Sequence, residues 1–515
     1  MVKLAIVQGG DALPTWLVEV DKELRGQEKG GIAAVIALAG RESRSARTLK
    51  RRALRPLQMI EARAVVPPQA DAIVASNLPE AKWTVAASNA DLIDAISETR
   101  PDIVVCEGDT PFEQMLHVAS QTPARVWCLG ECWTDIVPPR FVRACRAHSG
   151  YVDIGIVEVR RSGAVIEIDQ LRLMVPPRVM TPAIHQHFWA IGRKLVEAVS
   201  KVSVASPAAE IAHMPTVRVS TREVLALTSV LAARRLAWRL RRESEPHWWL
   251  AFGSCDQHGP LKQDFASFKV IDRPPDRFWA DPFVIEDSGR HYVFFEELLH
   301  SEGRGRIAAA EIGPSGIIGE VRTVLAEPWH LSYPQLLRID GHWHMIPESG
   351  EAGHVTAYVA SEFPLSWKKK TTLLSGVKAF DATLFEHGGR WWMFATLSGG
   401  HAASNMHELH LFHADHPLSE QWLAHPANPI LTDITAARPA GAIIRHGGRL
   451  YRPSQDCRHW YGYGLVLNEI EVLSETRYEE RPVRRWLTGD NGGHRWRGLH
   501  TYNTSGPVAV IDVLA

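Results

Sequence analysis

Four related segments recur in the second half of the chain, and their spacing limits the fold more than any other feature of the sequence. Each segment reads as a strand, a glycine-containing turn and a second strand. The segments are FWADPFVIEDSGRHYVFFEE, HLSYPQLLRIDGHWHMIPES, AFDATLFEHGGRWWMFATLS and ARPAGAIIRHGGRLYRPSQD. Alignment brings Asp281, Tyr333, Asp381 and Arg438 into register, at intervals of 333 − 281 = 52, 381 − 333 = 48 and 438 − 381 = 57 residues. A repeat of about 50 residues with three or four strands is typical of a propeller blade.

A further strand follows each hairpin, and the two ends of this half can supply one more blade. The following strands read RIAAAEI, VTAYVAS, LHLFHAD and GLVLNEI. The segment HWWLAFGS precedes the repeats, and VAVIDV follows them. Pairing of these two segments would close the ring, so residues 246–515 are predicted to form an all-β five-bladed β-propeller.

Carboxylates stand at both ends of the predicted hairpins. Because the innermost strand of each blade begins near the central channel, Asp281 and Asp381 should approach each other there. In the same register the second strands end at Glu296, Glu348, Thr396 and Gln455. Burying an unpaired carboxylate is costly, whereas several carboxylates around one funnel suit acid, base or nucleophilic chemistry at a glycosidic carbon. The alternative is that these polar residues hold neighbouring blades together.

A different pattern fills residues 1–205, where short β-branched runs alternate with helical segments. The runs KLAIVQ, IAAVIALA, WTVAAS, DIVVCEG and ARVWCLG read as strands. A hairpin at 151–175 and a long helix at 182–202 complete this part. The repeated order of strand and helix predicts an α/β Rossmann-like domain with a mostly parallel sheet covered on both faces.

The order of these elements resembles the formyltransferase fold, which is related to methionyl-tRNA and sugar-nucleotide formyltransferases. The resemblance implies an Asn, a His and an Asp around the formyl carbon, with the His in a turn after a central strand. Here that turn reads ECWTDIVPPR, with Glu131 and Cys132 where the His is required and Asp135 available as the acid. Formyl transfer without the His lacks its main acid or electrophile. We therefore expect a degenerate copy that binds a ligand or acts as a scaffold.

Residues 206–245 are predicted to be a linker followed by a basic amphipathic helix. The segment TREVLALTSVLAARRLAWRLRRESE sets leucines and a tryptophan among arginines. Such a helix either packs against one of the two domains, which we favour in a multidomain chain, or lies on an anionic membrane surface through residues 222–243.

Composition excludes several classes of protein and partner. A formal net charge of −1 offers no electrostatic reason to expect nucleic acid as a partner. Six cysteines scattered over 515 residues fit a reducing cytoplasm better than a disulfide scaffold. The N-terminus reads as a strand instead of a secretion signal, and no apolar run is long enough to span a bilayer. We expect a cytoplasmic protein, at most peripheral to the inner membrane.

No cofactor or metal site is expected. The sequence contains no Walker loop, HExxH or G-x-S-x-G element. His407, His410, His413 and His416 are close in sequence, but alternate residues of a strand face opposite sides, so the spacing is poor for one metal ion. Of 18 tryptophans, 12 lie after position 245. Their indole rings suit either the apolar faces of sugars or aromatic packing in an all-β core.

The block from Phe278 to Glu480 resembles the N-terminal domain of plant glucosamine inositolphosphorylceramide transferases and their bacterial relatives. The segments that carry the resemblance are FWADPF, HLSYPQL, MIPES, AFDATLF, WWMFAT, RPAG and LYRPSQDC. It implies a five-bladed propeller similar to that of the arabinofuranosidase and xylosidase group. In the plant proteins a separate domain resembles the glycosyltransferase, and no obvious copy of that domain is found in this sequence.

The furanosidase pattern implies roles for the acidic residues. Asp281 would be the general base or nucleophile, and Asp381 or Glu348 the acid and the modulator of its pKa. Tyr333 occupies the second blade's usual acidic position, so the catalytic trio is matched in part. The residues expected to bind substrate hydroxyls, carboxylate or phosphate are Glu296, His330, Tyr333, Arg438, Arg452, Gln455 and Asp456.

Three functions remain open at this point. The first is a glycosyl-transferring enzyme of bacterial surface-polysaccharide or glycolipid biosynthesis, acting on a sugar or nucleotide sugar in the propeller funnel. The second is a glycoside hydrolase that uses the same carboxylates. The third is a non-catalytic module that binds a glycan or a partner protein. The donor, the acceptor, the linkage and the oligomeric state cannot be predicted from the residues.

Overall fold

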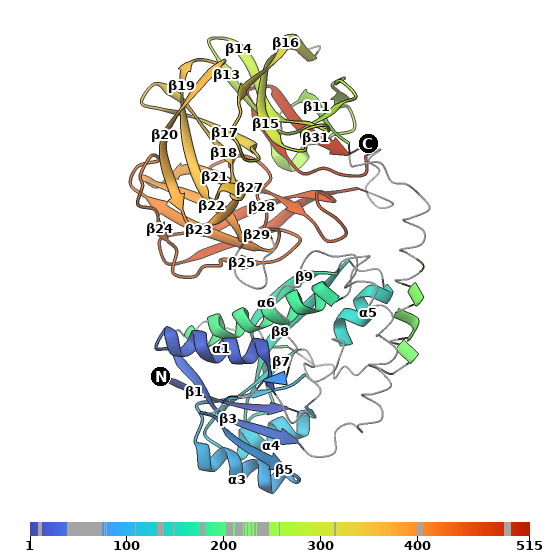
Figure 1. Cartoon of the computed structure of the whole chain (residues 1–515), viewed down its shortest axis with the longest axis vertical. Coiled ribbons are helices and arrows are strands. Elements are labelled where there is room, and N and C mark those ends of the chain that lie inside the picture. The colour runs from blue at the N-terminus through green and yellow to red at the C-terminus, as the bar shows by residue number, and fades with distance from the viewer. Residues whose placement is uncertain are drawn as a thin grey trace. The chain divides into compact units, whose positions relative to one another are not determined.

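The computed structural model divides the chain into two compact units, Met1–Arg242 and Glu243–Ala515. Each unit is described by itself below (Figure 1). The structure describes residues 1–8, 13–38, 75–76, 78, 80–108, 110–130, 139–147, 150–175, 181–201, 210–211, 220, 222–223, 225–227, 229–230, 233, 247–256, 258–313, 316–398, 405–488 and 496–514.

The first unit is built on an eight-stranded sheet with the order β10-β9-β8-β7-β6-β1-β3-β5. Its parallel strands are β1 (Val2–Gln8), β3 (Gly30–Leu38), β5 (Lys82–Ala86), β6 (Ile103–Cys106) and β7 (Arg125–Leu129). Its antiparallel edge consists of β8 (Tyr151–Val159), β9 (Val165–Met174) and β10 (Glu210–Ile211). The short strands β2 (Leu13–Pro14) and β4 (Ala75–Ser76) pair separately.

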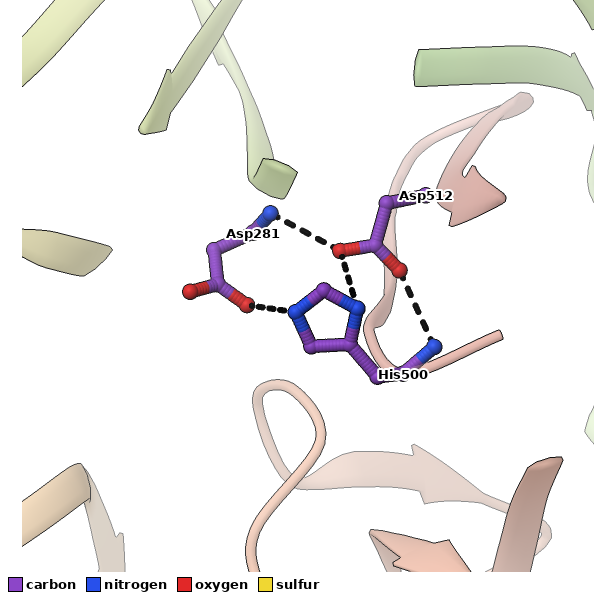
Figure 2. A group of neighbouring side chains, drawn as sticks. All are labelled: Asp281, His500 and Asp512. Atoms are coloured by element: carbon purple, nitrogen blue, oxygen red, sulfur yellow. Dashed lines mark hydrogen bonds and ion pairs between the residues drawn. The ribbon is translucent and has the colours of Figure 1, made fainter. Parts of the chain in front are cut away.

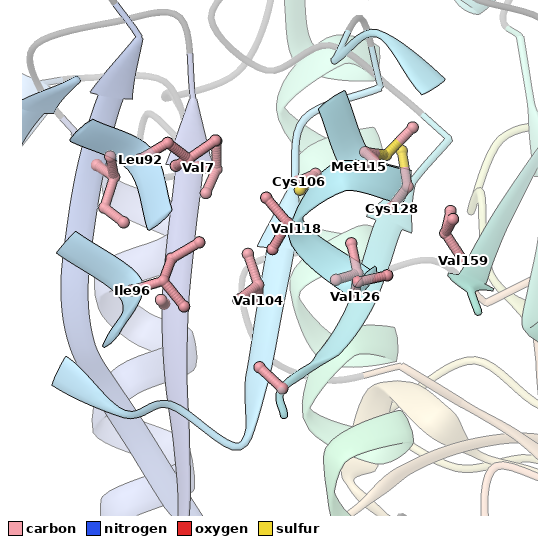
Figure 3. Close-up of a cluster of buried hydrophobic side chains, with 14 of the residues drawn as sticks. Val7, Leu92, Ile96, Val104, Cys106, Met115, Val118, Val126, Cys128 and Val159 are labelled. Carbon is pink, nitrogen blue, oxygen red and sulfur yellow. The ribbon is translucent and has the colours of Figure 1, made fainter. Parts of the chain in front are cut away.

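Helices follow the parallel strands, as the sequence pattern predicted. They are α1 (Thr15–Gly26), α3 (Asn89–Thr99), α4 (Phe112–Gln121), α5 (Pro139–Ala147) and α6 (Thr181–Ser200). Helices α3 and α4 cover one face of the sheet through a core that includes Leu92, Ile96, Met115 and Val118 (Figure 3). Alternate strand residues point to opposite faces, and α1 and α6 lie on the other side, where Trp16 stacks on Phe188 with ring centroids 6.0 Å apart.

The described part of this unit agrees with the predicted alternation of strands and helices and with the predicted hairpin. Its relation to the formyltransferase fold stays a prediction, because Glu131, Cys132 and Asp135 lie outside the described residues. The expected basic helix at 222–243 also falls largely outside them. Among the helices that the structure describes, none is long and apolar enough to cross a membrane.

The second unit is a five-bladed β-propeller, as the repeats predicted (Figure 1). The first blade comprises β13 (Arg277–Asp287), β14 (Arg290–Leu299), β15 (Gly305–Gly313) and β16 (Gly316–Leu325). The second comprises β17 (Ser332–Ile339), β18 (His342–Glu348), β19 (His354–Glu362) and β20 (Ser366–Ser375), with the 3₁₀ turn η2 (Gly350–Ala352) between β18 and β19.

The remaining blades repeat this order. The third contains β21 (Lys378–His387), β22 (Arg390–Ser398), β23 (Glu408–Ala414), β24 (Leu423–Ala424) and β25 (Leu431–Thr432). The fourth contains β26 (Ile444–His446), β27 (Arg449–Asp456), β28 (Gly464–Leu473) and β29 (Tyr478–Leu487). The closing blade has the order β12-β11-β31-β30, from β12 (Lys269–Val270), β11 (Trp248–Ser254), β31 (Val508–Leu514) and β30 (Tyr502–Ser505), with the 3₁₀ turn η1 (Pro260–Lys262) between β11 and β12.

The ring closes by pairing its first and last long strands. β11 pairs with β31 in antiparallel register from Trp248↔Leu514 to Ser254↔Val508. These are the segments HWWLAFGS and VAVIDV, so the predicted closure is confirmed. The strands of this blade come from both ends of the unit. Separation of β11 from β31 would therefore open the ring.

Apolar and aromatic side chains fill the spaces between neighbouring blades. One cluster joins Phe294 of the first blade to Tyr358 and Trp367 of the second. Among the tryptophans after position 245, seven are buried: Trp248, Trp279, Trp367, Trp392, Trp422, Trp486 and Trp496. Their burial favours aromatic packing over sugar stacking for these seven residues, while Trp460 is exposed.

Candidate functional site

The inner strands of three blades share an unusual backbone conformation at one position. Asp281, Tyr333 and Asp381 have positive φ angles of 51°, 45° and 53°. Each lies where the pairing of the inner hairpin shifts register, between Ala280 and Phe283 in the first blade and at the matching points of β17 and β21. Positive φ is uncommon for residues other than glycine, particularly for a bulky tyrosine. The repeated bulge therefore sets these three side chains at equivalent places in the ring.

The neighbouring strand of each blade supplies a second polar residue at an equivalent place. Glu296 pairs with Ala280, Glu348 pairs with Ser332, and Thr396 pairs with Phe380. Each partner directly precedes one of the positive-φ residues. The register that the repeats suggested for the first three hairpins is thus the register of the structure.

The fourth hairpin departs from the predicted register by two residues. In the first three hairpins the positive-φ residue precedes the last paired residue of its strand by 287 − 281 = 6, 339 − 333 = 6 and 387 − 381 = 6 residues. The last pair of the fourth hairpin is His446↔Arg449, so the equivalent position is 446 − 6 = 440, which is Ala440. Arg438 therefore lies before the repeat position, and it reaches Asp381 from there.

Asp281 is held by residues of the closing blade (Figure 2). Thr501 Oγ1 donates a hydrogen bond to Asp281 Oδ1 at 2.7 Å, and His500 Nε2 lies 3.0 Å from the same oxygen. On the other side of the imidazole ring, Nδ1 lies 3.0 Å from Asp512 Oδ2. Asp512 Oδ2 also accepts a hydrogen bond from the backbone N–H of Asp281 at 2.8 Å. One buried imidazole thus joins two buried carboxylates.

The charges of this group favour a protonated His500 and an ionised Asp281. Burial opposes the charge of His500, but Asp512 and Asp281 raise the pKa of the imidazole to about 10. Burial likewise opposes ionisation of Asp281, yet His500 and the hydrogen bond from Thr501 hold the pKa of this carboxyl below its usual value. At neutral pH Asp281 is therefore a carboxylate.

Glu348 has the opposite character. Its carboxyl accepts hydrogen bonds from Gly350 N–H at 2.5 Å and from Ser332 Oγ at 3.2 Å, and no ion pair to it occurs among the described residues. Burial, followed by the charge of Asp381, raises the pKa of Glu348 to about 7. Glu348 can therefore hold or release a proton near neutral pH.

Asp381 forms a bidentate ion pair with Arg438. Arg438 Nε donates to Asp381 Oδ2 at 2.6 Å, and Nη2 donates to Oδ1 at 3.3 Å. Gln455 Nε2 donates to Oδ2 at 3.3 Å. Burial and the charge of Asp281 raise the pKa of Asp381 to about 6 in spite of Arg438, so the pair is ionised at neutral pH. The charge of Asp281 affects the pKa of Asp381, and the charge of Asp381 affects the pKa of Glu348, so Asp381 lies within electrostatic reach of both other acids.

The buried Glu296 and the half-buried His330 form a second pair beside this group. His330 Nε2 lies 3.2 Å from Glu296 Oε1, without the geometry of a hydrogen bond. Burial raises the pKa of Glu296. For His330, burial acts against the charge, but Glu296 raises its pKa to about 9. However, Gly305 N–H donates to His330 Nδ1 at 3.1 Å, which requires a lone pair on Nδ1 and favours the neutral ring with its proton on Nε2.

Two residues of the inner ring carry buried oxygens that lack a hydrogen-bond partner among the described residues. They are Oε1 of Glu296 and Oγ1 of Thr396, at equivalent positions of the first and third blades. Buried polar atoms are normally satisfied, so Thr396 Oγ1 marks a place where a ligand hydroxyl can bind, whereas Glu296 Oε1 already faces His330 Nε2 at 3.2 Å. Thr396 was noted in the sequence register but not predicted to bind substrate.

Other predicted binding residues serve the propeller itself. Tyr333 is fully buried, and its hydroxyl accepts a hydrogen bond from Gly441 N–H at 2.6 Å and lies 2.9 Å from Thr383 Oγ1. Arg452 pairs with Glu480 and donates to the carbonyl of Ala436 at 2.7 Å. These contacts join strands and blades, which is the alternative that the sequence left open for polar residues here.

Asp456 is likewise engaged within the fourth blade. Its carboxylate accepts from Arg458 Nε at 2.8 Å and from Arg485 Nη1 at 3.1 Å, and it is fully buried. Gln455 has a different placement, because its side chain contacts Asp381. The predicted residues nearest the acids are thus Glu296, His330, Arg438 and Gln455, whereas the side-chain contacts of Tyr333, Arg452 and Asp456 are structural.

Sequence reasoning missed His500, Thr501 and Asp512. All three lie in the closing blade, which lacks the hairpin motif of the other four. The segment GLHTYN, which runs into β30, and the Asp within the apolar run VAVIDV are the signals that could have revealed them. A carboxylate in an otherwise apolar closing strand requires a buried partner.

Asp281, His500 and Asp512 form the one group within the described part of the chain that could hold a metal ion. One ligand atom from each of Asp281, His500 and Asp512 lies within 4.8 Å of the others. The two ring nitrogens of His500 face different carboxylates, however, and both carboxylates accept further hydrogen bonds. This arrangement suits an imidazolium between two carboxylates without a metal.

Comparison with known proteins finds a family model that is similar to the propeller. The family model described as "Glucosamine inositolphosphorylceramide transferase 1, N-terminal" matches residues 266–505. This range includes Asp281, Glu348, Asp381 and His500 and ends before Asp512. The matched part of the chain is thus similar to the N-terminal domain of that family, as the sequence motifs predicted.

Full-length relatives extend well beyond the matched region. Glucosamine inositolphosphorylceramide transferase 1 of Oryza sativa subsp. japonica is 32% identical over 249 residues, which is 46% of this chain and 33% of the relative. The protein of the same name from Arabidopsis thaliana is 34% identical over 233 residues, which is 44% of this chain and 30% of the relative. The chain therefore spans about a third of the length of the relatives it matches.

Solved structures give a weaker similarity. Zg3597, a family 117 glycoside hydrolase from Zobellia galactanivorans, is 12% identical with a TM-score of 0.34, and the alignment covers 53% of this chain and 92% of that chain. A similarity of this size carries no conclusion about chemistry.

Proposed function

We propose that the propeller is a carbohydrate-active domain of the glycosyl-transfer type, with its site at the inner ends of the first three blades. The observation that supports this most is the divergence of two buried carboxyls. Asp281 is kept ionised by His500, whereas the pKa of Glu348 is raised to about 7. Acid and base catalysis at a glycosidic carbon is usually performed by two carboxyl groups whose pKa values differ.

The roles follow from the protonation states. Asp281 would accept the proton of the acceptor hydroxyl while the oxygen of that hydroxyl forms a bond to the anomeric carbon. Glu348 would donate a proton to the leaving oxygen as the bond from that oxygen to the anomeric carbon breaks. Asp381 would stay paired with Arg438 and keep the pKa of Glu348 high by its charge. Glu296 and Thr396 offer oxygens that can bind the hydroxyls of a sugar.

The relatives are glucosamine inositolphosphorylceramide transferases, which favours a transferase over a hydrolase, although the matching family model describes only their N-terminal part. We therefore propose a sugar or nucleotide sugar as the donor. The membrane contact and the cytoplasmic location expected from the sequence remain proposals of the same kind.

A second function has one observation in its favour. Asp281 and Asp381, two of the three predicted catalytic acids, are held by ion pairs to residues of other blades or their connections. Such contacts are what a non-catalytic binding module would retain to hold its blades together. In that case the propeller would recognise a glycan without changing it.

The test is a transfer assay with wild-type protein, Asp281→Asn and a control. Nucleotide sugars with sugar acceptors, and separately aryl glycosides in water, would be supplied as donors. We expect product from nucleotide sugars and a loss of roughly a hundredfold or more in kcat/KM for Asp281→Asn. Asp340→Asn is a matched control, since Asp340 is exposed and also has positive φ.

Three outcomes separate the functions. Product from aryl glycosides alone would assign hydrolysis to the same carboxylates. Release of sugar from neither donor class would exclude both enzymes, and glycan binding by the inactive protein would then support the module. Equal activity of Asp281→Asn and wild type would contradict the role of Asp281.

A further inference from the structure

The last strand of the propeller brings a buried acid to the candidate site. Asp512 lies on β31, paired with Leu250 of β11, and it is fully buried. Its Oδ1 accepts hydrogen bonds from the backbone N–H groups of His500 at 3.0 Å and Thr501 at 2.8 Å. Its Oδ2 accepts one from Asp281 N–H at 2.8 Å and lies 3.0 Å from His500 Nδ1.

These contacts link two distant parts of the chain through one carboxylate. Asp281 belongs to the first blade, and His500 and Thr501 directly precede the innermost strand of the closing blade. Asp512 holds the backbone of both sides and also orients the imidazole. A carboxylate that satisfies three backbone donors and faces a ring nitrogen has a defined position.

The ring of His500 is also enclosed by aromatic side chains. Trp248 of β11 packs against it with ring centroids 4.1 Å apart, and Tyr461 does so at 5.1 Å. Since β11 and β31 pair with each other, the two closing strands supply both the acid and the indole around the imidazole. An imidazolium in this setting is stabilised by the two carboxylates, and the aromatic rings fix its orientation.

The arrangement determines what Asp281 can do. Its Oδ1 faces His500 and Thr501, whereas no hydrogen bond to its Oδ2 occurs within the described residues. Figure 2 shows the second oxygen turned away from the imidazole. This leaves Oδ2 for contact with a ligand, while Oδ1 is fixed.

Resting on the proposed function, we propose that His500 and Asp512 are positioning residues that hold Asp281 as an oriented carboxylate, so that closure of the ring by β31 completes the site. Neither residue exchanges a proton with the substrate. Asp512 lies beyond the region that matches the family model, so the inference comes from the geometry of this chain.

Several charged or titratable groups face this network and share in its electrostatics. Asp281 affects the pKa of Glu296, His330, Tyr333, Asp381 and Tyr461 and is itself affected by Arg438. His500 affects the pKa of Glu296 and Asp381. Substitution of a charged member of this set, such as Asp381 or Arg438, would shift the titration of the network, so the first test below alters Asp512, which contacts only Asp281 and His500 among them.

The first experiment follows His500 itself and needs no activity. The full chain would be labelled with ¹⁵N-histidine, and the signal of His500 would be assigned by its loss in His500→Gln. We expect both ring nitrogens to stay protonated at pH 9 in the wild-type protein. In Asp512→Asn the titration should move down by about one pH unit or more, because one of the two carboxylates is removed.

Three results of this experiment would overturn the inference. They are titration of His500 near 6.5 in the wild-type protein, no change in Asp512→Asn, or movement of the His500 signal on addition of EDTA or Ca²⁺. The last result would assign the group to a metal. The wild-type measurement alone is decisive if Asp512→Asn does not fold.

The second experiment measures kcat/KM against pH for wild type, His500→Gln and Asp340→Asn. Loss of the imidazolium should raise the pKa of Asp281 and move the acid limb of the profile of His500→Gln up by about one unit. A purely structural role would lower activity at all pH values and leave the limb in place. Inactive wild-type protein with a His500 still protonated at pH 9 would overturn the proposed function while supporting the positioning network.

Discussion

Arg438 and Asp381, 438 − 381 = 57 residues apart in the chain, form a buried bidentate ion pair with Nε 2.6 Å from Oδ2. Arg438 also donates to the carbonyl of Asn405 at 3.0 Å and packs against the rings of Phe380 and Tyr461. The pair thus joins the third blade to the connection before the fourth, directly beside the candidate acids.

Removal of this arginine should destabilise the propeller strongly. Arg438→Gln leaves Asp381 buried without a cation, and loss of one member of a buried pair costs about 3–5 kcal/mol. Urea denaturation of the variant and of Arg322→Gln checks this. Arg322 pairs with Glu320 on the surface, so its substitution should change the free energy of unfolding by less than about 1 kcal/mol. Similar losses in both variants would contradict a special role for the buried pair.

Glu348→Gln should stabilise the fold at alkaline pH while it removes activity. The folded-state pKa of about 7 exceeds the ordinary value of 4.5, so ionisation is disfavoured in the folded protein. The free energy of unfolding therefore falls as pH rises from 4.5 through 7. Above pH 7 the folded protein bears the full cost of the ionised Glu348 carboxylate. From the size of the pKa shift of Glu348, the variant should be more stable than wild type by roughly 1–3 kcal/mol at pH 8.

The control for this variant is its own behaviour at low pH. Near pH 4 Glu348 is protonated in both states, so the advantage of Glu348→Gln should disappear there. A variant that is less stable than wild type at pH 8 in thermal or urea unfolding would show that the carboxylate is compensated by contacts other than those of Gly350 and Ser332.

His500 should make the stability of the propeller depend on pH in the range where its folded and unfolded pKa values differ. The folded value is about 10 and the ordinary value 6.5. The stabilisation is thus fully present below pH 6.5 and is lost as pH rises through 10. Urea unfolding at pH 6, 8 and 10 gives the free energies of unfolding of wild type and His500→Gln. We expect the difference between these two free energies to narrow as pH rises. A constant difference would indicate a neutral imidazole.

Tyr333→Phe should destabilise the propeller without changing the pH dependence of activity. The substitution leaves the buried N–H of Gly441 without its acceptor, which costs about 1–3 kcal/mol. Unfolding by urea measures the loss of stability. We expect kcat/KM of the folded variant to stay within about threefold of wild type, because the contacts of the hydroxyl hold strands and blades together. A large change in KM with unchanged stability would instead return Tyr333 to the substrate site.

The blade count and the positions of Glu296, Glu348 and Thr396 could be predicted because each inner hairpin repeats one length between bulge and turn. The closure could be predicted because two apolar segments remained without partners. The sequence misaligned the fourth hairpin. The segment RPAG resembles the starts of the other inner hairpins, and alignment on that segment puts Arg438 in register, two residues before the structural equivalent, Ala440.

His500 and Asp512 could not be found in the same way. The innermost strand of the closing blade, β30, is four residues long, and its hairpin with β31 does not share the sequence pattern of the other four hairpins. Contacts between Asp281 and Asp512 span 512 − 281 = 231 residues and depend on the ring being closed, which no local pattern encodes. Similarly, the hydrogen bond from Gly441 N–H to the hydroxyl of Tyr333 crosses blades, and no local pattern encodes it.

The central claim is that Asp281 and Glu348 act as base and acid, and the pH dependence of kcat/KM for sugar transfer tests it most directly. Since Glu348 has to be protonated, kcat/KM should decline above about pH 7, by about tenfold for each pH unit, as expected for a single essential acid. A profile that is level from pH 6 to 9, or one that rises through pH 7, would contradict the assignment.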